Sequence, residues 1–428
     1  MIEITNKPKE RAILVALDTK EFSKEVIQEH IDELEELANT AGAETIFKVI
    51  QSKRTIDPAF YIGKGKAEGL AQLIETNEIN IVIFDDDLSP VQVRNLENIF
   101  NRKVIDRSGL ILDIFASRAK SKEAKTQVEL AQLQYMLPRL TRAWTHLSKQ
   151  YGGIGTKGPG ETQIETDRRL IRTRISVLKN KLEKIESHRQ TQISGRKNFF
   201  KIAIAGYTNA GKSTLFNLLT DANVFAENKL FATLDSTTRT LDISNSRKIL
   251  ISDTVGFIRK LPAHLVASFK STLNEVREAN IILHVIDLSH NYFEDHIKVV
   301  DQTLQELGVF DKKVIKVFNK VDLVKDKSIL DYVRNFYKES VIISAFRGIN
   351  ISSLIEIIKN ILNESTYEEK IELPIKDYKT ATQIHKFADV LKTDYDEEKI
   401  YITYRTNKQN SEKIKKLLSL DLNQKKSL

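Results

Sequence analysis

The feature that most limits what this chain can fold into is a glycine-rich segment between an apolar run and an amphipathic segment. Residues 201–205 read KIAIA, which is typical of a buried strand. The next residues have the spacing G-x-x-x-x-G-K-S, and they are Gly206, Tyr207, Thr208, Asn209, Ala210, Gly211, Lys212 and Ser213. In a strand-loop-helix context this spacing predicts a phosphate-binding P-loop, and therefore an α/β domain.

Each residue type in this loop has a chemical reason. Glycines let the backbone wrap closely, so that N–H groups point at a β-phosphate and the positive end of the following helix adds to them. We expect Lys212 to place a positive charge near the β- and γ-phosphates, and the Ser213 hydroxyl to ligate Mg2+. The loop alone does not distinguish ATP from GTP.

A second pattern discriminates between the two bases. After the apolar run 314–318 the chain reads N-K-x-D, with residues Asn319, Lys320, Val321 and Asp322. The Asp322 carboxylate can accept hydrogen bonds from N1–H and the exocyclic amine of guanine, whereas adenine would leave this carboxylate unsatisfied. A further strand candidate, 340–343, precedes Ser344, Ala345 and Phe346, which suit a loop that closes over the base.

Two segments between these motifs are candidate γ-phosphate sensors. The strand candidate 248–252 ends in a D-x-x-G pattern, with residues Asp253, Thr254, Val255 and Gly256. Asp253 would hold a Mg2+-bound water, and the Gly256 N–H would sense the γ-phosphate. The earlier segment Phe231, Ala232, Thr233, Leu234 and Asp235 offers Thr233 as the remaining Mg2+ ligand, with Thr237 and Thr238 as alternatives. Together these motifs predict a Mg2+-dependent GTP hydrolase whose P-loop domain spans about 199–362.

The residue after the D-x-x-G pattern departs from the Ras-like arrangement. Ras-like GTPases have a glutamine there that orients the attacking water, whereas this chain has Phe257. A phenylalanine side chain forms no hydrogen bond to water, so catalysis by this chain would depend on Lys212 and Gly256 and on groups from elsewhere. We therefore predict a low basal rate with strong stimulation, of the order of the 10^3- to 10^5-fold known for this chemistry.

Length and composition exclude several other classes. The chain has 428 residues, more than one hydrophobic core usually supports, which predicts several domains. It has no cysteine, so disulfides and thiolate metal sites are excluded. No apolar run approaches the roughly 20 residues that cross a bilayer. We expect a cytoplasmic monomer without stable membrane insertion that at most associates peripherally with a membrane.

The region before the P-loop divides in two. Residues 1–118 alternate apolar runs with amphipathic stretches, which predicts a small α/β domain. Within it, Tyr61 to Lys66 is a glycine-punctuated turn with two lysines, and an ordinary strand-to-helix turn explains it better than a phosphate site does. Residues 119–190 carry two apolar seams separated by the glycine-rich stretch 151–160, which predicts an antiparallel helical hairpin with a long tip. We expect Pro138 to kink the first helix without ending it.

The hairpin is also strongly basic. The formal charge of the chain is +8, and its Lys and Arg residues concentrate between 102 and 201 and in the last twenty residues. Basic and aromatic side chains mixed around a tip are used to grip phosphates and stack on unpaired bases. The candidate RNA-contact residues are Arg142, Lys149, Lys157, Arg168, Arg169 and Arg172. The alternatives are a solvated face on a structural hairpin, or a hairpin that binds a protein partner.

The chain after the P-loop domain is short. We predict a linker at 363–372 and a small α/β domain at 371–428, with a strand at 371–375, a helix near 381–391, a strand at 399–404 and a basic helix from about Asn410. Its role is not indicated by any motif.

These features together resemble the HflX family of ribosome-associated GTPases. The resemblance rests on the order of the GTPase motifs with Phe257, on the run from Val128 to Leu140, and on Tyr61 to Lys66. It rests most specifically on the glycine-rich stretch Gly152 to Gln163. It implies a GTPase that binds the large ribosomal subunit and its rRNA, inserts the hairpin toward the peptidyl-transferase region and splits stalled or idle ribosomes, often under heat stress.

The resemblance carries further expectations. Family members are reported to bind ATP through the N-terminal region. Asn209 matches an asparagine with which related GTPases hold K+, so the resemblance implies a K+ ion beside Mg2+ as a second cofactor. From the residues alone, a GTP-regulated ribosome-assembly or signalling module whose hairpin binds a protein remains the alternative.

Overall fold

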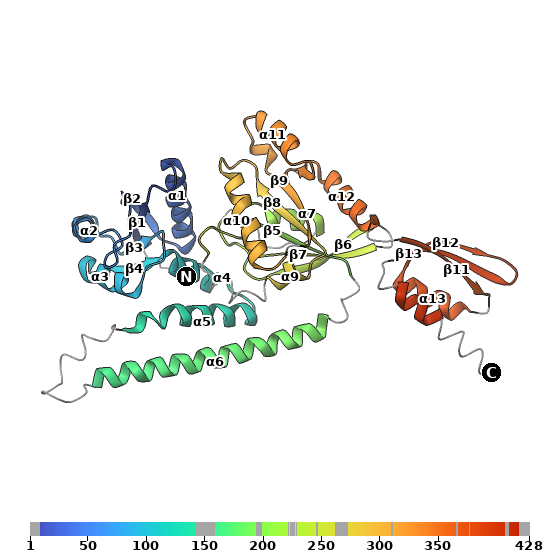
Figure 1. Cartoon of the computed structure of the whole chain (residues 1–428), viewed down its shortest axis with the longest axis horizontal. Coiled ribbons are helices and arrows are strands. Elements are labelled where there is room, and N and C mark those ends of the chain that lie inside the picture. Colours follow the sequence, from blue (N-terminus) through green and yellow to red (C-terminus); the bar gives the residue numbers. More distant parts are fainter. Residues whose placement is uncertain are drawn as a thin grey trace, which may run out of the picture.

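A computed structural model describes residues 9–141, 159–193, 199–220, 222, 227, 229–244, 247–261, 273–309, 311–364, 367–375, 377–406 and 411–418. Its described elements form an N-terminal α/β unit, a helical pair, a central α/β unit and a small C-terminal unit (Figure 1). The predicted fold class is therefore confirmed. Among the helices described, none is both long enough and apolar enough to pass through a lipid bilayer.

The N-terminal unit is a parallel sheet with strand order β2-β1-β3-β4. Its elements are β1 (Arg11–Asp18), α1 (Lys24–Ala41), β2 (Glu44–Ser52), α2 (Lys64–Thr76), β3 (Ile81–Phe84), α3 (Pro90–Phe100), β4 (Lys103–Asp106) and α4 (Arg107–Arg118). Strands β1 and β3 are buried over nearly their whole length because helices cover both faces of the sheet. The helix α1 begins at an N-cap serine, Ser23, and ends at Gly42 in the left-handed conformation.

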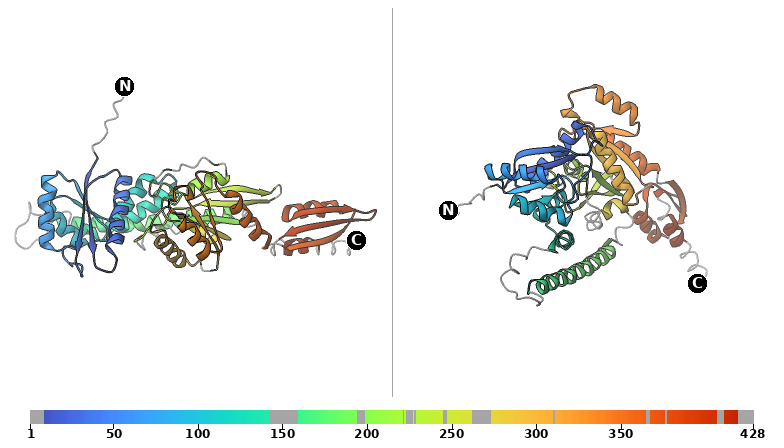
Figure 2. Two further views of the ribbon diagram at one scale, coloured as in Figure 1. Left: turned by 90° about the horizontal axis from the view of Figure 1, so that it is seen from above. Right: turned by 60° about the vertical axis from the view of Figure 1, so that its left-hand side comes forward.

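The helical pair consists of α5 (Lys122–Met136) and α6 (Pro159–Ile193), which lie side by side along the N-terminal and central units (Figures 1 and 2). An ion pair between Arg174 and Glu129 joins them at 2.6 Å. The expectation that Pro138 only kinks the first helix is wrong. Helix α5 ends at Met136, and a short 3-10 turn, η1 (Arg139–Thr141), follows, because proline has no N–H to continue the helical hydrogen bonds and its ring crowds the preceding turn.

The central unit is a mostly parallel sheet with strand order β10-β9-β8-β5-β7-β6, in which only the β6–β7 pair is antiparallel. Its elements are β5 (Lys201–Gly206), α7 (Lys212–Thr220), β6 (Thr237–Ser244), β7 (Arg247–Asp253), α9 (Asn274–Glu278), β8 (Ile281–Asp287), α10 (Phe293–Glu306), β9 (Lys313–Asn319), η4 (Val321–Leu323), α11 (Ser328–Phe336), β10 (Ser340–Ile342) and α12 (Ile351–Glu364). The carboxyl ends of β5, β7 and β9 therefore meet at one edge, where ligands of open α/β sheets bind.

The C-terminal unit is an antiparallel sheet, β11-β13-β12, with helix α13 packed on it. Its elements are β11 (Tyr367–Pro374), α13 (Tyr378–Phe387), β12 (Asp389–Tyr395), β13 (Lys399–Thr406) and a helical segment at 411–418. Two expectations are wrong here. Most of the predicted linker belongs to β11, and the predicted helix ends at Phe387 because the next residues pair with β13 as β12.

Candidate nucleotide-binding site

A cavity of about 480 Å³ opens at the carboxyl edge of the central sheet. It is lined by loops that follow β5, β7, β9 and β10, together with the segment before β6. The lining residues are Thr208, Asn209, Gly211, Lys212, Ser213, Thr214, Glu227, Lys229, Phe231, Ala232, Thr233, Thr254, Gly256, Asn319, Lys320, Asp322, Leu323, Phe346 and Arg347. Most of the predicted motifs thus meet around one cavity.

The backbone of the loop after β5 is shaped by residues that accept unusual conformations. Asn209 and Gly211 both have positive φ, at 60° and 91°. A Cβ atom on Gly211 would lie 2.3 Å from the Asn319 side-chain nitrogen, so only glycine fits there. Gly256 is equally constrained, because a Cβ on it would lie 2.9 Å from the Lys212 ammonium nitrogen. The glycines of the two motifs therefore correspond to two close backbone approaches.

Lys212 is almost fully buried at the base of this cavity. Its ammonium group donates a hydrogen bond to the carbonyl oxygen of Tyr207 at 2.7 Å. Burial lowers the pKa of Lys212 to about 8, although the nearby Asp253 carboxylate opposes that shift. A cation held in such a site is stabilised by an incoming anion, as a phosphate-binding role requires.

Three oxygen-bearing side chains gather beside Lys212. The Ser213 hydroxyl donates to Asp253 Oδ2 at 2.6 Å and lies 2.8 Å from the Thr233 hydroxyl. Asp253 Oδ1 is buried and has no hydrogen-bond partner among the residues that the structure describes. Burial raises the pKa of Asp253, which a neighbouring cation would reverse. An all-oxygen donor set with one unsatisfied carboxylate oxygen fits a hard divalent cation such as Mg2+.

The N-K-x-D segment has a structural half and a recognition half. Asn319 is buried and joins two loops, since its amide donates to the Ala210 carbonyl at 2.9 Å and accepts from the Ala345 N–H at 2.9 Å. Lys320 adopts a left-handed φ of 62° and pairs with Asp287 at 2.7 Å. That turn brings Asp322 to the cavity, where its side chain is exposed. Such a carboxylate is accessible to an incoming base.

Some predicted site residues do not line the cavity. They are Gly206, Tyr207, Ala210, Leu234, Asp235, Asp253, Val255, Val321, Ser344 and Ala345. Asp253 reaches the cavity through its hydrogen bond to Ser213, and Ser344 is buried and accepts a hydrogen bond from the Arg347 N–H. Asp235 faces elsewhere: its carboxylate accepts hydrogen bonds from the backbone N–H groups of Lys120 and Ser121 at 3.0 and 3.2 Å.

Sequence reasoning missed several lining residues, namely Thr214, Glu227, Lys229, Leu323 and Arg347. Thr214, Leu323 and Arg347 directly follow a recognised motif, so extending each motif by one residue would have found them. Glu227 and Lys229 lie in a stretch without any pattern. They come to the cavity only because the chain before β6 folds over it.

Phe257 does not point into the cavity. Its side chain is 2 % exposed and belongs to a hydrophobic cluster with Val255 and Ile258. Its backbone is paired with the P-loop, since the Thr208 N–H donates to the Phe257 carbonyl at 2.7 Å and the Phe257 N–H donates to Gly206 at 3.0 Å. The phenylalanine therefore anchors the D-x-x-G segment to the P-loop. Its side chain does not take the role of the glutamine that orients water in Ras-like GTPases.

The predicted RNA-contact residues are only partly within the described structure. Arg142, Lys149 and Lys157 lie outside the described residues. Arg168 is half-buried on α6, and Arg169 and Arg172 are exposed on the same helix. Their role in binding RNA stays a prediction.

Comparisons with known proteins agree on one family. Family models match residues 28–116 (GTP-binding GTPase N-terminal), 118–196 (GTP-binding GTPase Middle Region) and 201–320 (50S ribosome-binding GTPase). "GTPase HflX" of Lacrimispora saccharolytica is 48 % identical over 399 residues, covering 92 % of both chains. "GTPase HflX" of Escherichia coli is 40 % identical over 389 residues, covering 90 % of both chains.

Among solved structures, a GTP-binding protein from Sulfolobus solfataricus in complex with GDP is 28 % identical, with a TM-score of 0.44 over 83 % of this chain and 99 % of the other. The relatives with high identity span almost the whole chain, and most of the predicted nucleotide-binding motifs meet at one cavity. The chain belongs to the HflX family of GTPases and is a GTP-hydrolysing enzyme.

Proposed function

We propose that this GTPase binds the large ribosomal subunit and uses GTP hydrolysis to split or rescue stalled or idle ribosomes. The family model over the central unit is described as a 50S ribosome-binding GTPase, and α6 exposes arginines that suit contact with rRNA phosphates. Acting on ribosomes would place the protein in the cytoplasm.

One observation carries the proposal: the segment that lines the nucleotide cavity also contacts the base of the helical pair. Thr233 lies in the oxygen cluster beside Ser213, and two residues later Asp235 accepts hydrogen bonds at the start of α5. The Phe231 ring packs edge-on against the ring of Phe115 on α4, with 4.8 Å between the ring centroids. A change of this segment on hydrolysis would therefore reach the helices that carry the basic surface.

The residues of the cavity divide the chemical work. Lys212 would bind the β- and γ-phosphate oxygens, and the Gly256 N–H would bind the γ-phosphate. Ser213 and Thr233 would hold Mg2+ directly and Asp253 would hold it through a water, and bound Mg2+ would neutralise charge on the phosphate oxygens. Asn209 lines the cavity and would be the ligand of a K+ ion.

Phe257 does not position the attacking water, because its ring is buried and forms no hydrogen bonds. We infer that the ribosome completes this part of the site. A slow basal reaction that waits for its partner would prevent futile GTP consumption away from ribosomes.

GTP turnover measured with and without purified large subunits tests the proposal. We expect stimulation of at least about 10^3-fold, as in other GTPases completed by a partner. Stimulation of less than about threefold would remove the ribosomal assignment. If small subunits stimulate GTP turnover as much as large subunits do, the assignment of the large subunit as the partner is wrong.

A second arm tests the mode of contact. Binding through rRNA phosphates should weaken steeply and linearly on a log-log plot as salt is raised. The charge reversals Arg169→Glu and Arg172→Glu should each weaken binding further than Arg334→Glu, the same change at an exposed arginine of α11, outside the helical pair. Salt-independent binding would favour a protein partner for the hairpin.

A further inference from the structure

The interface between α1 and the central unit is a cluster of charged side chains that are nearly all buried. Arg107 is 1 % exposed and pairs with both Glu33 and Asp85, the latter at 2.6 Å. Arg259, two residues after Phe257, pairs with Glu29 and lies 3.4 Å from Glu33. Charges buried this deeply are costly unless each has a partner, so the two units fit each other closely.

Tyr207 stands at the centre of this cluster. Its hydroxyl donates to Glu33 and accepts a hydrogen bond from the Arg259 N–H at 3.0 Å. Its ring stacks on the imidazole of His296 at 3.8 Å, with an interplanar angle of 5°. The side chain is 4 % exposed. A group held on three sides in this way has little freedom to move.

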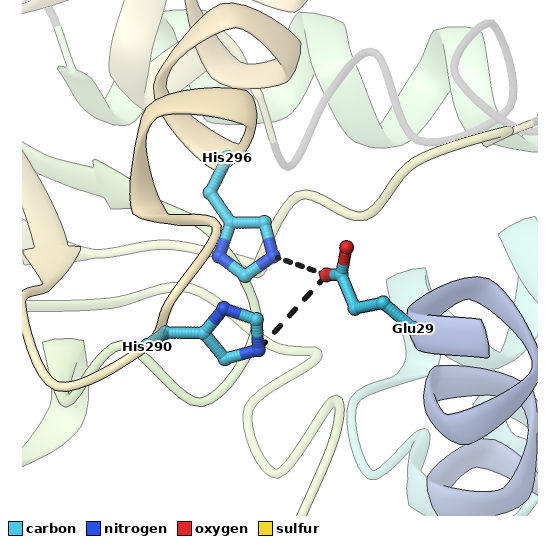
Figure 3. A group of neighbouring side chains, drawn as sticks. All are labelled: Glu29, His290 and His296. Carbon is cyan, nitrogen blue, oxygen red and sulfur yellow. Dashed lines mark ion pairs between the residues drawn. The ribbon is translucent and has the colours of Figure 1, made fainter. Parts of the chain in front are cut away.

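Figure 3 shows the neighbouring part of the cluster, in which His290 and His296 both face Glu29. Their Nε2 atoms lie 4.0 and 3.5 Å from Glu29 Oε1. Although burial alone would raise it, the pKa of Glu29 is lowered to about 2, by the neighbouring His296 imidazole and by the charge of Arg259. The carboxylate is therefore ionised and holds the two units together.

This trio has the composition of a metal site, but its hydrogen bonds argue against one. His290 Nδ1 accepts a hydrogen bond from the Tyr292 N–H at 3.2 Å. A neutral imidazole with Nδ1 as acceptor carries its proton on Nε2, the atom that faces Glu29. That atom therefore presents a proton, and no free lone pair, toward the carboxylate 4.0 Å away, and the Arg259 guanidinium paired with Glu29 would repel a cation.

The backbone of Tyr207 belongs to the catalytic loop. Its carbonyl accepts from Lys212, and the residues on either side, Gly206 and Thr208, exchange hydrogen bonds with Phe257. The same residue thus joins the N-terminal unit, through its side chain, to the P-loop and to the D-x-x-G segment, through its backbone and neighbours.

We propose that Tyr207 is a positioning residue for GTP hydrolysis, whose hydroxyl, held by Glu33 of the N-terminal unit, fixes the P-loop relative to the Gly256–Arg259 segment. The affected segment, Gly256–Arg259, is the one that would contact the γ-phosphate. GDP has no γ-phosphate, and the guanine base would be bound by other loops. Loss of the hydroxyl therefore reduces the rate of hydrolysis and leaves nucleotide affinity intact. The N-terminal unit is on this account a structural part of the hydrolytic site.

A double-mutant cycle on the full chain tests this. Tyr207→Phe, Glu33→Gln and the double variant are compared with the parent for kcat, for KM and for GDP affinity. We expect Tyr207→Phe to lower kcat about tenfold, well inside the roughly 100-fold that a small misplacement can cost. KM and GDP affinity should stay within about twofold. The double variant should lose less than the product of the two single fold-losses, because both changes remove the same Tyr207–Glu33 bond.

The matched control is Tyr404→Phe. Tyr404 is also a buried tyrosine whose hydroxyl donates to a glutamate, Glu369, at 2.8 Å, but it lies in the C-terminal unit. It should leave kcat unchanged. An unchanged or increased kcat in Tyr207→Phe, additive losses in the double variant, or a rise of KM at constant kcat would each overturn the proposal. A thermal melt of each variant identifies any that fails to fold, and Glu33→Gln then carries the comparison.

Discussion

Asp322, the carboxylate predicted to recognise guanine, is exposed and is placed at the cavity by a backbone turn. Asp322 follows Lys320, whose left-handed conformation turns the chain after β9, and the pair between Lys320 and Asp287 holds that turn. Asn319 supports it from below by joining the P-loop to the loop after β10. The carboxylate of Asp322 is thus accessible, while Asn319, which joins the neighbouring loops, is buried.

Replacing Asp322 by Asn should exchange the preferred base. The amide offers a donor where guanine also has donors, so we expect GTP affinity to fall by about 100-fold or more, while xanthosine triphosphate becomes the better ligand. Competition binding with both nucleotides measures this. Asp326→Asn is the control, because it makes the same chemical change four residues later, outside the cavity. Full retention of guanine preference in Asp322→Asn would refute the base-recognition argument.

At the same scale, motifs in the sequence predicted backbone better than side chains. The spacing of glycines predicted where the backbone of the loops is closely packed, because glycine is required wherever a Cβ would collide, as at Gly211 and Gly256. The direction of Asp235 and the burial of Phe257 depend on partners from α5 and from the core. Those partners are distant in sequence, so no local pattern indicates them.

At the level of elements, α6 is held by a narrow buried stripe. Leu178 is 1 % exposed, whereas its neighbour Val177 is 50 % exposed, so successive residues of this helix face the protein and the solvent. The ion pair between Arg174 and Glu129 lies one turn away and is half in water, so it contributes little. Apolar burial therefore carries most of the docking of α6.

Truncation of the two neighbours should separate these contributions. Leu178→Ala should weaken the docking of α6 by about 2 to 5 kcal/mol, since it removes buried surface and leaves a cavity. Val177→Ala should change it by less than about 0.5 kcal/mol. Amide hydrogen exchange across 165–188 reports the difference. Equal protection in the two variants would mean that α6 is not held through Leu178.

The predictions of helix and strand bounds failed where the local composition indicated a different structure from the one that forms. Apolar periodicity continued past Pro138, yet α5 ends at Met136, two residues before it. The periodicity reports which side chains can be buried by packing, whereas the missing N–H of proline interrupts the helical hydrogen bonds directly. Polar composition predicted a linker where β11 lies, because an edge strand with one buried face reads as polar. Buried strands such as β1 and β5 were predicted well, since their apolar runs have no competing explanation.

Across the whole molecule, charges of one unit act on titratable groups of another. His30 on α1 is buried, and burial together with the positive charges of Arg259, Lys260 and Arg107 lowers its pKa to about 3 from 6.5. The unfolded chain then binds a proton more readily than the folded chain below pH 6.5. Stability should therefore rise with pH through this window, and should be lost as pH falls from 6.5 toward 3.

Removing this group should flatten the acid side of the stability profile. Between pH 6.5 and 5 we expect the parent to lose up to about 1.4 kcal/mol per pH unit more than His30→Gln. Urea unfolding at several pH values measures the slopes. His188→Gln, a change at an exposed histidine of α6, should leave the profile unaltered. If the free energy of unfolding depends on pH in the same way in the parent and in His30→Gln, the buried His30 does not cause the loss of stability at low pH.

The P-loop tyrosine and the ring of Phe231 are both covered by other parts of the chain, the first by α1 and the second by α4. An excised central unit would present both aromatic surfaces to water and would lack the carboxylate that holds Tyr207. Rates determined on such a fragment would describe an enzyme without these two supports, so kinetic work on the central unit should keep the N-terminal unit attached.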